Sequence, residues 1–182
     1  MSVFGIEIGN GWSLSLIYLA VSYIPMLLGG KAAKRLVDFS FASTMGKIHS
    51  FVIMLLSILF LAYPVFLKIQ GGTFLFYTGL GLFVLSAIAT ITSFINYFST
   101  PLNQTICKGM YKISRNPIYV SVTFMEFGMS LMCHSVIMAI LLVVMLILQH
   151  FIILEEEKFC MEKYGERYRE FKQKVPRYLL FF

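Results

Sequence analysis

Long apolar stretches separated by short polar segments run along most of the chain. Three of them are long enough to cross a hydrocarbon core of about 30 Å, which takes roughly 20 helical residues. They cover residues 12–30, 48–67 and 73–98. The pattern predicts that each of them forms one membrane-spanning helix.

A fourth apolar stretch, residues 118–154, contains no proline and is too long for one span. As a straight helix it would measure about 55 Å, nearly twice the thickness of the core. We therefore expect it to turn back at residues 132–135 and to give a short fourth span and a fuller fifth one. The predicted fold class is all-α: a multi-pass transmembrane helical protein with about five spans and a C-terminal helical hairpin.

Composition and the placement of charge agree with a membrane protein. Of the 182 residues, 58% are hydrophobic and 13% are charged, whereas an ordinary soluble domain is about 45–50% apolar. Fourteen of the fifteen Lys and Arg residues flank the same ends of the predicted spans, and Lys68 alone lies on the other side. Positive residues of short loops stay in the cytoplasm. We therefore expect the N-terminus outside and the C-terminus in the cytoplasm. The same placement accounts for the net charge of +6, so the charge does not indicate binding to nucleic acid.

The chain is expected to form one membrane domain, residues 1–182, with four parts. Residues 1–98 hold three spans, residues 99–117 form a cytoplasmic loop, residues 118–154 form the hairpin, and residues 155–182 form a cytoplasmic tail. The three cysteines lack a CxxC pairing, so we expect free thiols rather than a disulfide framework or a zinc site. No cluster of His, Cys and carboxylates indicates another metal.

The polar segment GMYKISRNPIY lies between the third and fourth spans. Asn116 and Pro117 suit the start of a helix, and the basic residues suit a cytoplasmic flank, so a purely structural interpretation is open. The functional interpretation uses the same geometry. A helix that starts at Pro117 presents free N–H groups to the carboxylate or phosphate of a ligand. Arg115 would add a charge-assisted fork, and Tyr111 and Tyr119 would add aromatic faces with hydroxyls.

Three adjacent glutamates, residues 155–157, follow the fifth span. They repel one another and do little for topology. If the helix continues, Glu156 and Glu157 share one side of it and can accept hydrogen bonds from a ribose diol or pair with an ammonium. The alternative is a solvated acidic collar that balances the basic tail.

The tail after the glutamates carries apolar residues at spacings of three and four on an otherwise charged helix. This pattern predicts a cytoplasmic amphipathic helix, which lies along the membrane surface or packs over the ends of the spans. Gly165 predicts a break within it. The stripe consists of Cys160, Tyr164, Tyr168, Phe171 and Val175.

Together, these segments resemble a known family. The order G-x-Y-x-x-x-R-[HN]-P-x-Y, an apolar hairpin of about 35 residues, and then E-E with a following [FY]-G-x-x-Y and V-P-R is similar to the isoprenylcysteine carboxyl methyltransferase and phospholipid methyltransferase group of integral membrane enzymes. The resemblance covers about residues 100–177. Its residues are Gly109, Tyr111, Arg115, Asn116, Pro117, Tyr119, Glu156, Glu157, Tyr164, Gly165, Tyr168, Phe171, Val175, Pro176 and Arg177.

The resemblance implies a transferase that binds S-adenosylmethionine at the cytoplasmic face. It moves the methyl group to a lipid-like or small amphiphilic acceptor that arrives from the bilayer. Asn96 is a further candidate contact. By position, the cofactor contacts would fall on Tyr111, Asn116, Pro117, Ile118, Tyr119, Glu156 and Glu157, and on the backbone of residues 103–106, which include Gln104, Thr105 and Ile106.

Three positions depart from the family pattern. Asn116 stands where histidine is commoner, and Ser121 stands where glycine is usual. Enzymes of the group that methylate a prenylcysteine carboxylate carry an arginine about one turn before the glutamate pair, where this chain has Ile152. A substrate carboxylate would lack that partner, which argues against prenylcysteine and leaves a phospholipid amine as an alternative acceptor.

Glu126 lies about 13 Å into the membrane from Pro117. A charged carboxylate at that depth costs roughly 2.5 kcal/mol or more and often marks function, although a neutral, hydrogen-bonded structural role stays open. Across the hairpin, His150 or Gln149 is level with it. We hypothesise that Glu126 and its partner line the acceptor pocket, and that Glu126 or His150 takes the proton of an amine acceptor. Arg115, Glu126 and His150 are thus the candidate catalytic residues.

Two other classes stay open at the level of the sequence. Membrane sterol-reductase-like proteins share a similar C-terminal pattern and use a nicotinamide cofactor. A non-catalytic membrane protein, such as a transporter subunit or a scaffold, is the other. The lack of internal repeats and of polar residues along the first two spans argues against transport.

Overall fold

The computed structural model describes residues 9–36 and 41–179, and the regular elements within these ranges are helical. This confirms the predicted all-α class for the described part of the chain. The elements are α1 (Trp12–Leu28), α2 (Gly30–Leu36), α3 (Thr44–Ala62), the 3-10 helix η1 (Tyr63–Phe66), α4 (Phe74–Phe98), the 3-10 helix η2 (Gly109–Lys112), α5 (Pro117–Met132), α6 (Val136–Tyr164) and α7 (Glu166–Lys174).

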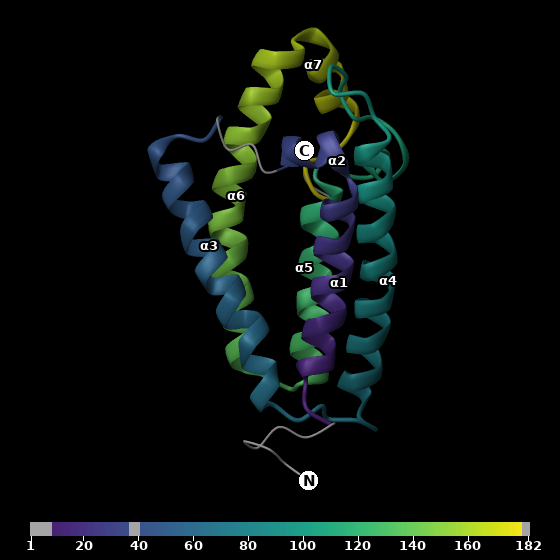
Figure 1. The fold of residues 1–182 in the computed structure, drawn as a ribbon, viewed down its shortest axis with the longest axis vertical. Coiled ribbons are helices and arrows are strands. Elements are labelled where there is room, and N and C mark those ends of the chain that lie inside the picture. The colour runs from purple at the N-terminus through teal and green to yellow at the C-terminus, as the bar shows by residue number, and fades with distance from the viewer. Residues whose placement is uncertain (1–8, 37–40, 180–182) are drawn as a thin grey trace.

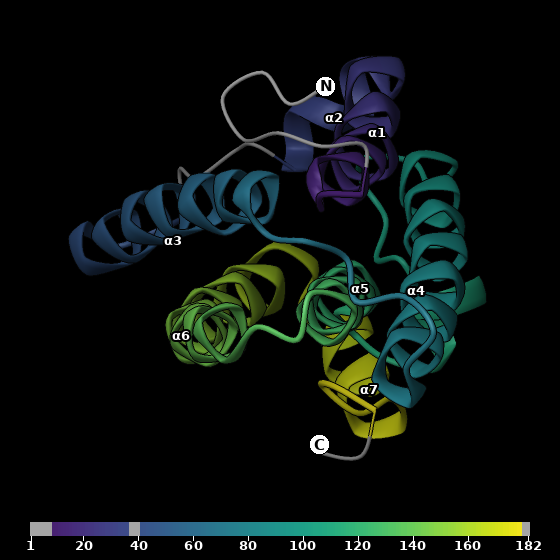
Figure 2. The ribbon, with the colours of Figure 1, turned by 90° about the horizontal axis from the view of Figure 1, so that it is seen from below.

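The long helices stand side by side in a bundle with two distinct ends (Figure 1). The first, which we call the α7 end, holds α7, α2 and the loop between α4 and α5. The other, the hairpin end, holds the turn between α5 and α6 and the connection from η1 to α4. Seen along the bundle, α3 packs beside α6, while α1, α4 and α5 form a second group (Figure 2). The hairpin thus returns the chain to the end that carries the loop of residues 99–116.

Three segments are long and apolar enough to cross a membrane by length and composition: Thr44–Phe66, Phe74–Phe98 and Val136–Tyr164. The helix α1 has 17 residues and α5 has 16, fewer than the roughly 20 that a span takes. Within the described residues, the structure supports a membrane protein with these three candidate spans. The count of about five spans and the orientation of the termini stay predictions.

The predicted limits of the first two spans differ from the observed helices. The helix α1 ends at Leu28 and α2 begins separately at Gly30, which adopts a φ of +54°. The helix α3 begins at Thr44, before the predicted residue 48. The reason is a cap, because the Ser43 hydroxyl accepts a hydrogen bond from the Gly46 N–H at 3.0 Å.

The predicted hairpin turn is confirmed. The helix α5 ends at Met132 and α6 begins at Val136, and between them His134 adopts a φ of +48°. The Ser135 hydroxyl caps α6. The helix then runs without interruption through the three glutamates, and the chain breaks at Gly165, with a φ of +55°, as expected.

The helices α4 and α5 approach each other closely through small residues. A Cβ on Gly79 would overlap the Gly128 carbonyl oxygen, and a Cβ on Gly128 would overlap that of Gly79. Farther along the same contact, the Thr90 hydroxyl donates to the Ser121 hydroxyl at 2.9 Å. Ser121 therefore joins the two helices with a buried hydrogen bond.

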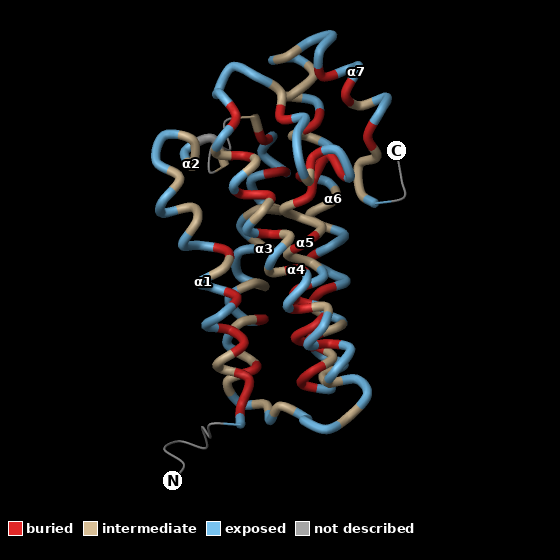
Figure 3. The backbone as a smooth tube through the Cα atoms, turned by 90° about the vertical axis from the view of Figure 1, so that its right-hand side faces the viewer, coloured by how far each residue is buried: buried red, intermediate tan, exposed pale blue. Residues whose placement is uncertain are grey.

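Buried and exposed residues alternate along the helices, so each helix turns one side inward and another outward (Figure 3). The main core contains methionines of the hairpin, while large aliphatic side chains cover much of the outer surface, as lipid contact requires. The tail was expected along the membrane surface or over the ends of the spans, and a second cluster at the α7 end supports packing over the helix ends. It consists of Tyr97, Ile106, Tyr111, Tyr168, Phe171 and Val175.

Candidate functional site

The Arg-Asn-Pro turn before α5 and the glutamates of α6 meet at the α7 end. Arg115 Nε donates to Glu157 Oε1 at 3.0 Å, and Arg115 Nη2 lies 3.5 Å from Glu157 Oε2. The two side chains are only 1% and 5% exposed. The two motifs therefore touch through a buried ion pair, as their positions along the chain predicted.

Arg115 also holds the tail of the chain. Its Nη1 donates to the carbonyl oxygens of Lys172 and Val175, both at 2.8 Å, and its backbone N–H donates to the Pro176 carbonyl at 2.9 Å. All three guanidinium nitrogens thus have partners within the protein. The fork expected to bind a ligand points at the tail instead, and the catalytic role of Arg115 stays a prediction.

Glu157 is surrounded by positive charge. Arg177 Nε and Nη2 donate to its two carboxylate oxygens at 3.1 and 3.0 Å, and Lys172 Nζ lies at 3.9 Å. These hydrogen bonds from Arg177 to Glu157 raise the pKa of Arg177, so its guanidinium stays charged. The Glu157 carboxylate therefore holds the tail against the turn through these bonds.

Asn116 takes part in the same attachment. Its Nδ2 and the Ser114 hydroxyl both donate to the Arg177 carbonyl oxygen, at 3.2 and 3.0 Å. Asn116 stands at the N-cap position of α5, as predicted, but its side chain makes no capping hydrogen bond. The side chain joins the turn to the tail instead.

A cavity of about 220 Å³ lies beside this network, and we call it the Glu156 cavity. The Tyr119 hydroxyl donates to Glu156 Oε2 at 3.3 Å. Most residues predicted to bind a cofactor line the cavity, but Pro117, Gln104 and the further candidate Asn96 do not. Those that do are Thr105, Ile106, Tyr111, Asn116, Ile118, Tyr119, Glu156 and Glu157.

The loop that forms one wall of the Glu156 cavity is fixed by Asn96. Asn96 Oδ1 accepts a hydrogen bond from the Met110 N–H at 2.9 Å, at the start of η2. Gly109 adopts a φ of +55° there, and a Cβ on it would overlap the Asn96 side chain. The glycine of the G-x-Y motif is therefore required by the backbone, and Asn96 positions the loop that carries Tyr111.

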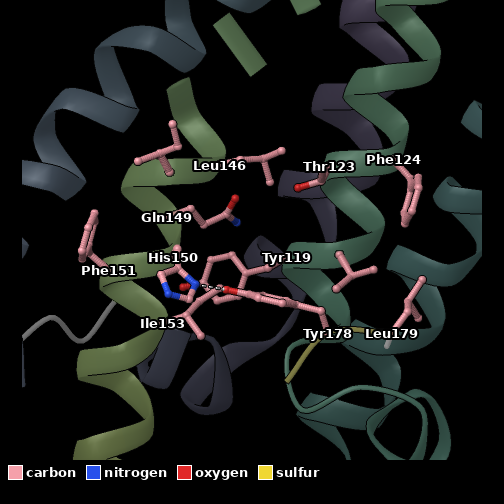
Figure 4. A pocket seen from close by; sticks show the side chains of 12 residues that line it. Tyr119, Thr123, Phe124, Leu146, Gln149, His150, Phe151, Ile153, Tyr178 and Leu179 are labelled. Atoms are coloured by element: carbon pink, nitrogen blue, oxygen red, sulfur yellow. Dashed lines mark hydrogen bonds between the residues drawn. The ribbon is translucent and has the colours of Figure 1, made fainter. Parts of the chain in front are cut away.

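A second cavity, of about 560 Å³, lies between α5 and α6, and we call it the His150 cavity (Figure 4). Its walls are mostly apolar, with Val120, Phe124 and Leu146 among them. One polar pair stands out, because His150 Nδ1 and the Tyr178 hydroxyl are 2.7 Å apart.

Tyr119 lines both cavities. Its side chain lies close to His150 and Tyr178 in the close-up (Figure 4), while its hydroxyl bonds Glu156 in the other cavity. Tyr119 is therefore accessible to a ligand from either cavity. This arrangement suits a reaction between two molecules that approach from different directions.

Glu126 lies outside the cavity that His150 and Gln149 line. It is buried and accepts a hydrogen bond from the Tyr18 hydroxyl of α1 at 2.9 Å. Neither of the two cavities is lined by it. The hypothesis placed Glu126 and its partner in one pocket, whereas of these residues only His150 and Gln149 line the His150 cavity. The catalytic roles of Glu126 and His150 stay predictions.

Several residues of the site carried no signal in the sequence. Met26, Leu36 and Phe41 come from the N-terminal region and line the Glu156 cavity. They are ordinary apolar residues in apolar surroundings, so no motif marks them. Arg177 belongs to the motif, but the motif does not indicate its bond to Glu157, and Tyr178 lies just beyond the motif.

Neither a metal site nor a disulfide forms part of this region. Within residues 9–36 and 41–179, no group of three or more His, Cys, Asp and Glu side chains is arranged to hold a metal ion. Cys107, Cys133 and Cys160 are free thiols. Cys107 is exposed, but partial desolvation of its thiol raises its pKa, which disfavours a reactive thiolate there.

Comparison with protein families gives one match. A family model described as phospholipid methyltransferase matches residues 67–167, more than half of the chain. The match contains the α4–α5 loop, the whole hairpin and the three glutamates. No curated protein and no solved structure matches the chain.

Proposed function

The chain belongs to the phospholipid methyltransferase family, and on that premise we propose that it is an S-adenosylmethionine-dependent methyltransferase of a lipid-like acceptor. The cofactor would bind in the Glu156 cavity and the acceptor in the His150 cavity. When bound, S-adenosylmethionine supplies an activated methyl group, so the protein's task is to position the two molecules and exclude water.

One observation carries the proposal. Glu157 is held by Arg115 and Arg177, while the adjacent Glu156 lines a cavity together with Tyr111 and Tyr119. Both carboxylates thus lie in the wall of the cavity, and Glu157 is the one whose oxygens are held by the two arginines. A carboxylate in the position of Glu156 can accept hydrogen bonds from a ribose diol or pair with an ammonium group.

The chemistry of the walls fits the proposed cofactor. The aromatic faces of Tyr97, Tyr111 and Tyr168 suit a purine ring and can attract a sulfonium cation. The volume of about 220 Å³ is below the roughly 300–1,000 Å³ of most ligand sites. Binding therefore requires side chains of the wall to move. Lys163 is one such side chain, because it is exposed and rests over the Phe159 ring at 5.3 Å.

The test is binding of the demethylated product, S-adenosylhomocysteine, to the purified protein in detergent. A saturating ligand stabilises the folded protein, by about 2.7 kcal/mol at one hundred times its Kd. We expect S-adenosylhomocysteine to raise the melting temperature of the natural protein, and Glu156→Ala to remove most of that rise.

Glu162→Ala is the matched control, because Glu162 is exposed on the same helix outside the cavity. It should keep the full rise in melting temperature. An equal rise in Glu156→Ala would contradict the proposed binding site. A rise with a nicotinamide dinucleotide in place of S-adenosylhomocysteine would favour the reductase alternative.

A further inference from the structure

The walls of the His150 cavity hold no charged side chain among the described residues that line it. Polar groups are few, and they include Thr123, Gln149, His150 and Tyr178. An anion held here would find no Lys or Arg among the lining residues to pair with, which makes its binding unfavourable. The cavity therefore disfavours a carboxylate or a phosphate at its polar end and favours an aliphatic chain along its walls.

The polar end is organised by the contact between His150 and Tyr178. Burial raises the pKa of the Tyr178 hydroxyl, so this phenol stays neutral. A neutral phenol oxygen can accept a hydrogen bond from the Nδ1–H of His150. In that tautomer, Nε2 carries the lone pair that can accept a proton, and the bond to Tyr178 persists when the ring becomes an imidazolium.

Tyr178 is held in place by its neighbour. Arg177 bonds Glu157 through two hydrogen bonds of 3.1 and 3.0 Å. His150 and Glu157 are seven residues apart on α6, so they lie about two turns apart on one side of the helix. The short segment Arg177–Tyr178 therefore connects the wall of the Glu156 cavity with the polar end of the His150 cavity.

The following inference rests on the proposed function. We propose that the His150 cavity binds an amphiphile whose reacting head is an amine without an adjacent anionic group. His150, positioned by Tyr178, accepts the proton of that amine. The acceptor would thus differ from a phospholipid, whose phosphate lies close to the amine.

The proton balance follows from the chemistry of an amine. An ammonium nitrogen has no lone pair for attack, so it first gives one proton to His150 Nε2 and becomes a neutral amine. Its lone pair then forms the new nitrogen–carbon bond as the sulfur–carbon bond of the cofactor breaks, and that bonding pair stays on sulfur. The products are a methylated ammonium, a neutral thioether and a His150 imidazolium, which releases its proton to water.

Other acceptor heads fit less well. A carboxylate needs no base but would bury its negative charge without a partner. An aliphatic alcohol is a much weaker nucleophile than a neutral amine, and it gives up its proton only as it attacks. An amine in an apolar cavity loses its proton more readily than in water, because desolvation disfavours the charged form. Only the amine uses both the apolar walls and the basic nitrogen.

Binding of three probes with the same chain tests this assignment: dodecylamine, dodecanoate and dodecanol. The chain has three histidines, so ¹³C-labelled histidine gives three NMR signals, and the one lost in His150→Gln belongs to His150. We expect dodecylamine to move the His150 signal selectively and to bind at least tenfold more tightly than dodecanoate or dodecanol. The full-length protein in a neutral detergent is used throughout.

Tyr178→Phe keeps the ring and removes only the hydroxyl. It should weaken dodecylamine binding several-fold and leave S-adenosylhomocysteine binding unchanged. The matched control is His134→Gln, because His134 lies in the hairpin turn at the opposite end of the bundle and bonds Thr73 there. It should keep the natural affinity for dodecylamine.

Dodecanoate binding as tightly as dodecylamine would overturn the proposal. So would equal movement of all three histidine signals, or preferential transfer of labelled methyl to phosphatidylethanolamine over dodecylamine. If S-adenosylhomocysteine still binds in those cases, only this inference fails. If dodecylamine binds selectively while S-adenosylhomocysteine does not, the proposed cofactor is wrong and the amine site stands.

Discussion

The two cavities of this protein share Tyr119 and are otherwise built differently. The Glu156 cavity lies beside a network of buried charges, in which Arg115 and Arg177 hold Glu157. The His150 cavity has apolar walls and one polar pair. A water-soluble charged ligand needs specific partners at fixed places, whereas an aliphatic chain needs only room and apolar contact. The first cavity therefore leaves a motif in the sequence and the second does not.

The largest expected effect comes from breaking the charge network. Arg115→Ala removes a buried ion pair and the donors to two carbonyl groups of the tail. Loss of one partner of a buried pair destabilises a protein by about 3–5 kcal/mol. We expect a large fall in the melting temperature in detergent and loss of S-adenosylhomocysteine binding.

The matched control uses an exposed arginine of the same end. Arg169 pairs with Glu166 on α7 at 3.0 Å, with both side chains more than 60% exposed. Such a pair contributes less than about 1 kcal/mol, so Arg169→Ala should melt close to the natural protein. A similar melting temperature for both variants would show that the Arg115 network is not what holds the tail.

A smaller effect is expected from the loop that carries Tyr111. Gly109→Ala places a side chain at a φ of +55° and against Asn96, which costs about 1–3 kcal/mol. We expect a moderate fall in the melting temperature and weaker S-adenosylhomocysteine binding, with dodecylamine binding preserved. The selective loss would separate the two cavities.

Gly81→Ala provides the comparison for that loop. Gly81 lies inside α4 with no neighbouring atom near the position of a Cβ. Alanine is the better helix former by about 1 kcal/mol, so this variant should be as stable as the natural protein or more so. If Gly109→Ala behaved in the same way, the strained loop would have no part in the site.

The sequence predicted the elements that depend on local pattern and on motif order. The length of the apolar stretches predicted the long helices, and the interruption at residues 132–135 predicted the hairpin turn. Gly165 predicted the break before α7. The meeting of Arg115 with the glutamates followed from the topology alone. A hairpin must return the chain to the end that it left.

Contacts between distant helices could not be predicted in the same way. Glu126 bonds Tyr18, which lies 108 residues away along the chain. Helices that face lipid are apolar on all sides, so their sequence pattern does not tell which side faces which neighbour. The bonds of Arg115 to the Lys172 and Val175 carbonyl oxygens could not be predicted either, because backbone carbonyls of the tail carry no residue signature. The pairing of His150 with Tyr178 depends on that same path of the tail.

The central claim is that the two cavities form one reaction site joined at Tyr119. The most direct test is to measure the affinities of S-adenosylhomocysteine and dodecylamine for Tyr119→Ala, beside Glu156→Ala and Tyr178→Phe. We predict that Tyr119→Ala weakens both ligands by about tenfold, or about 1.4 kcal/mol each, whereas each of the other variants weakens only one. Natural affinity of Tyr119→Ala for either ligand would contradict the claim.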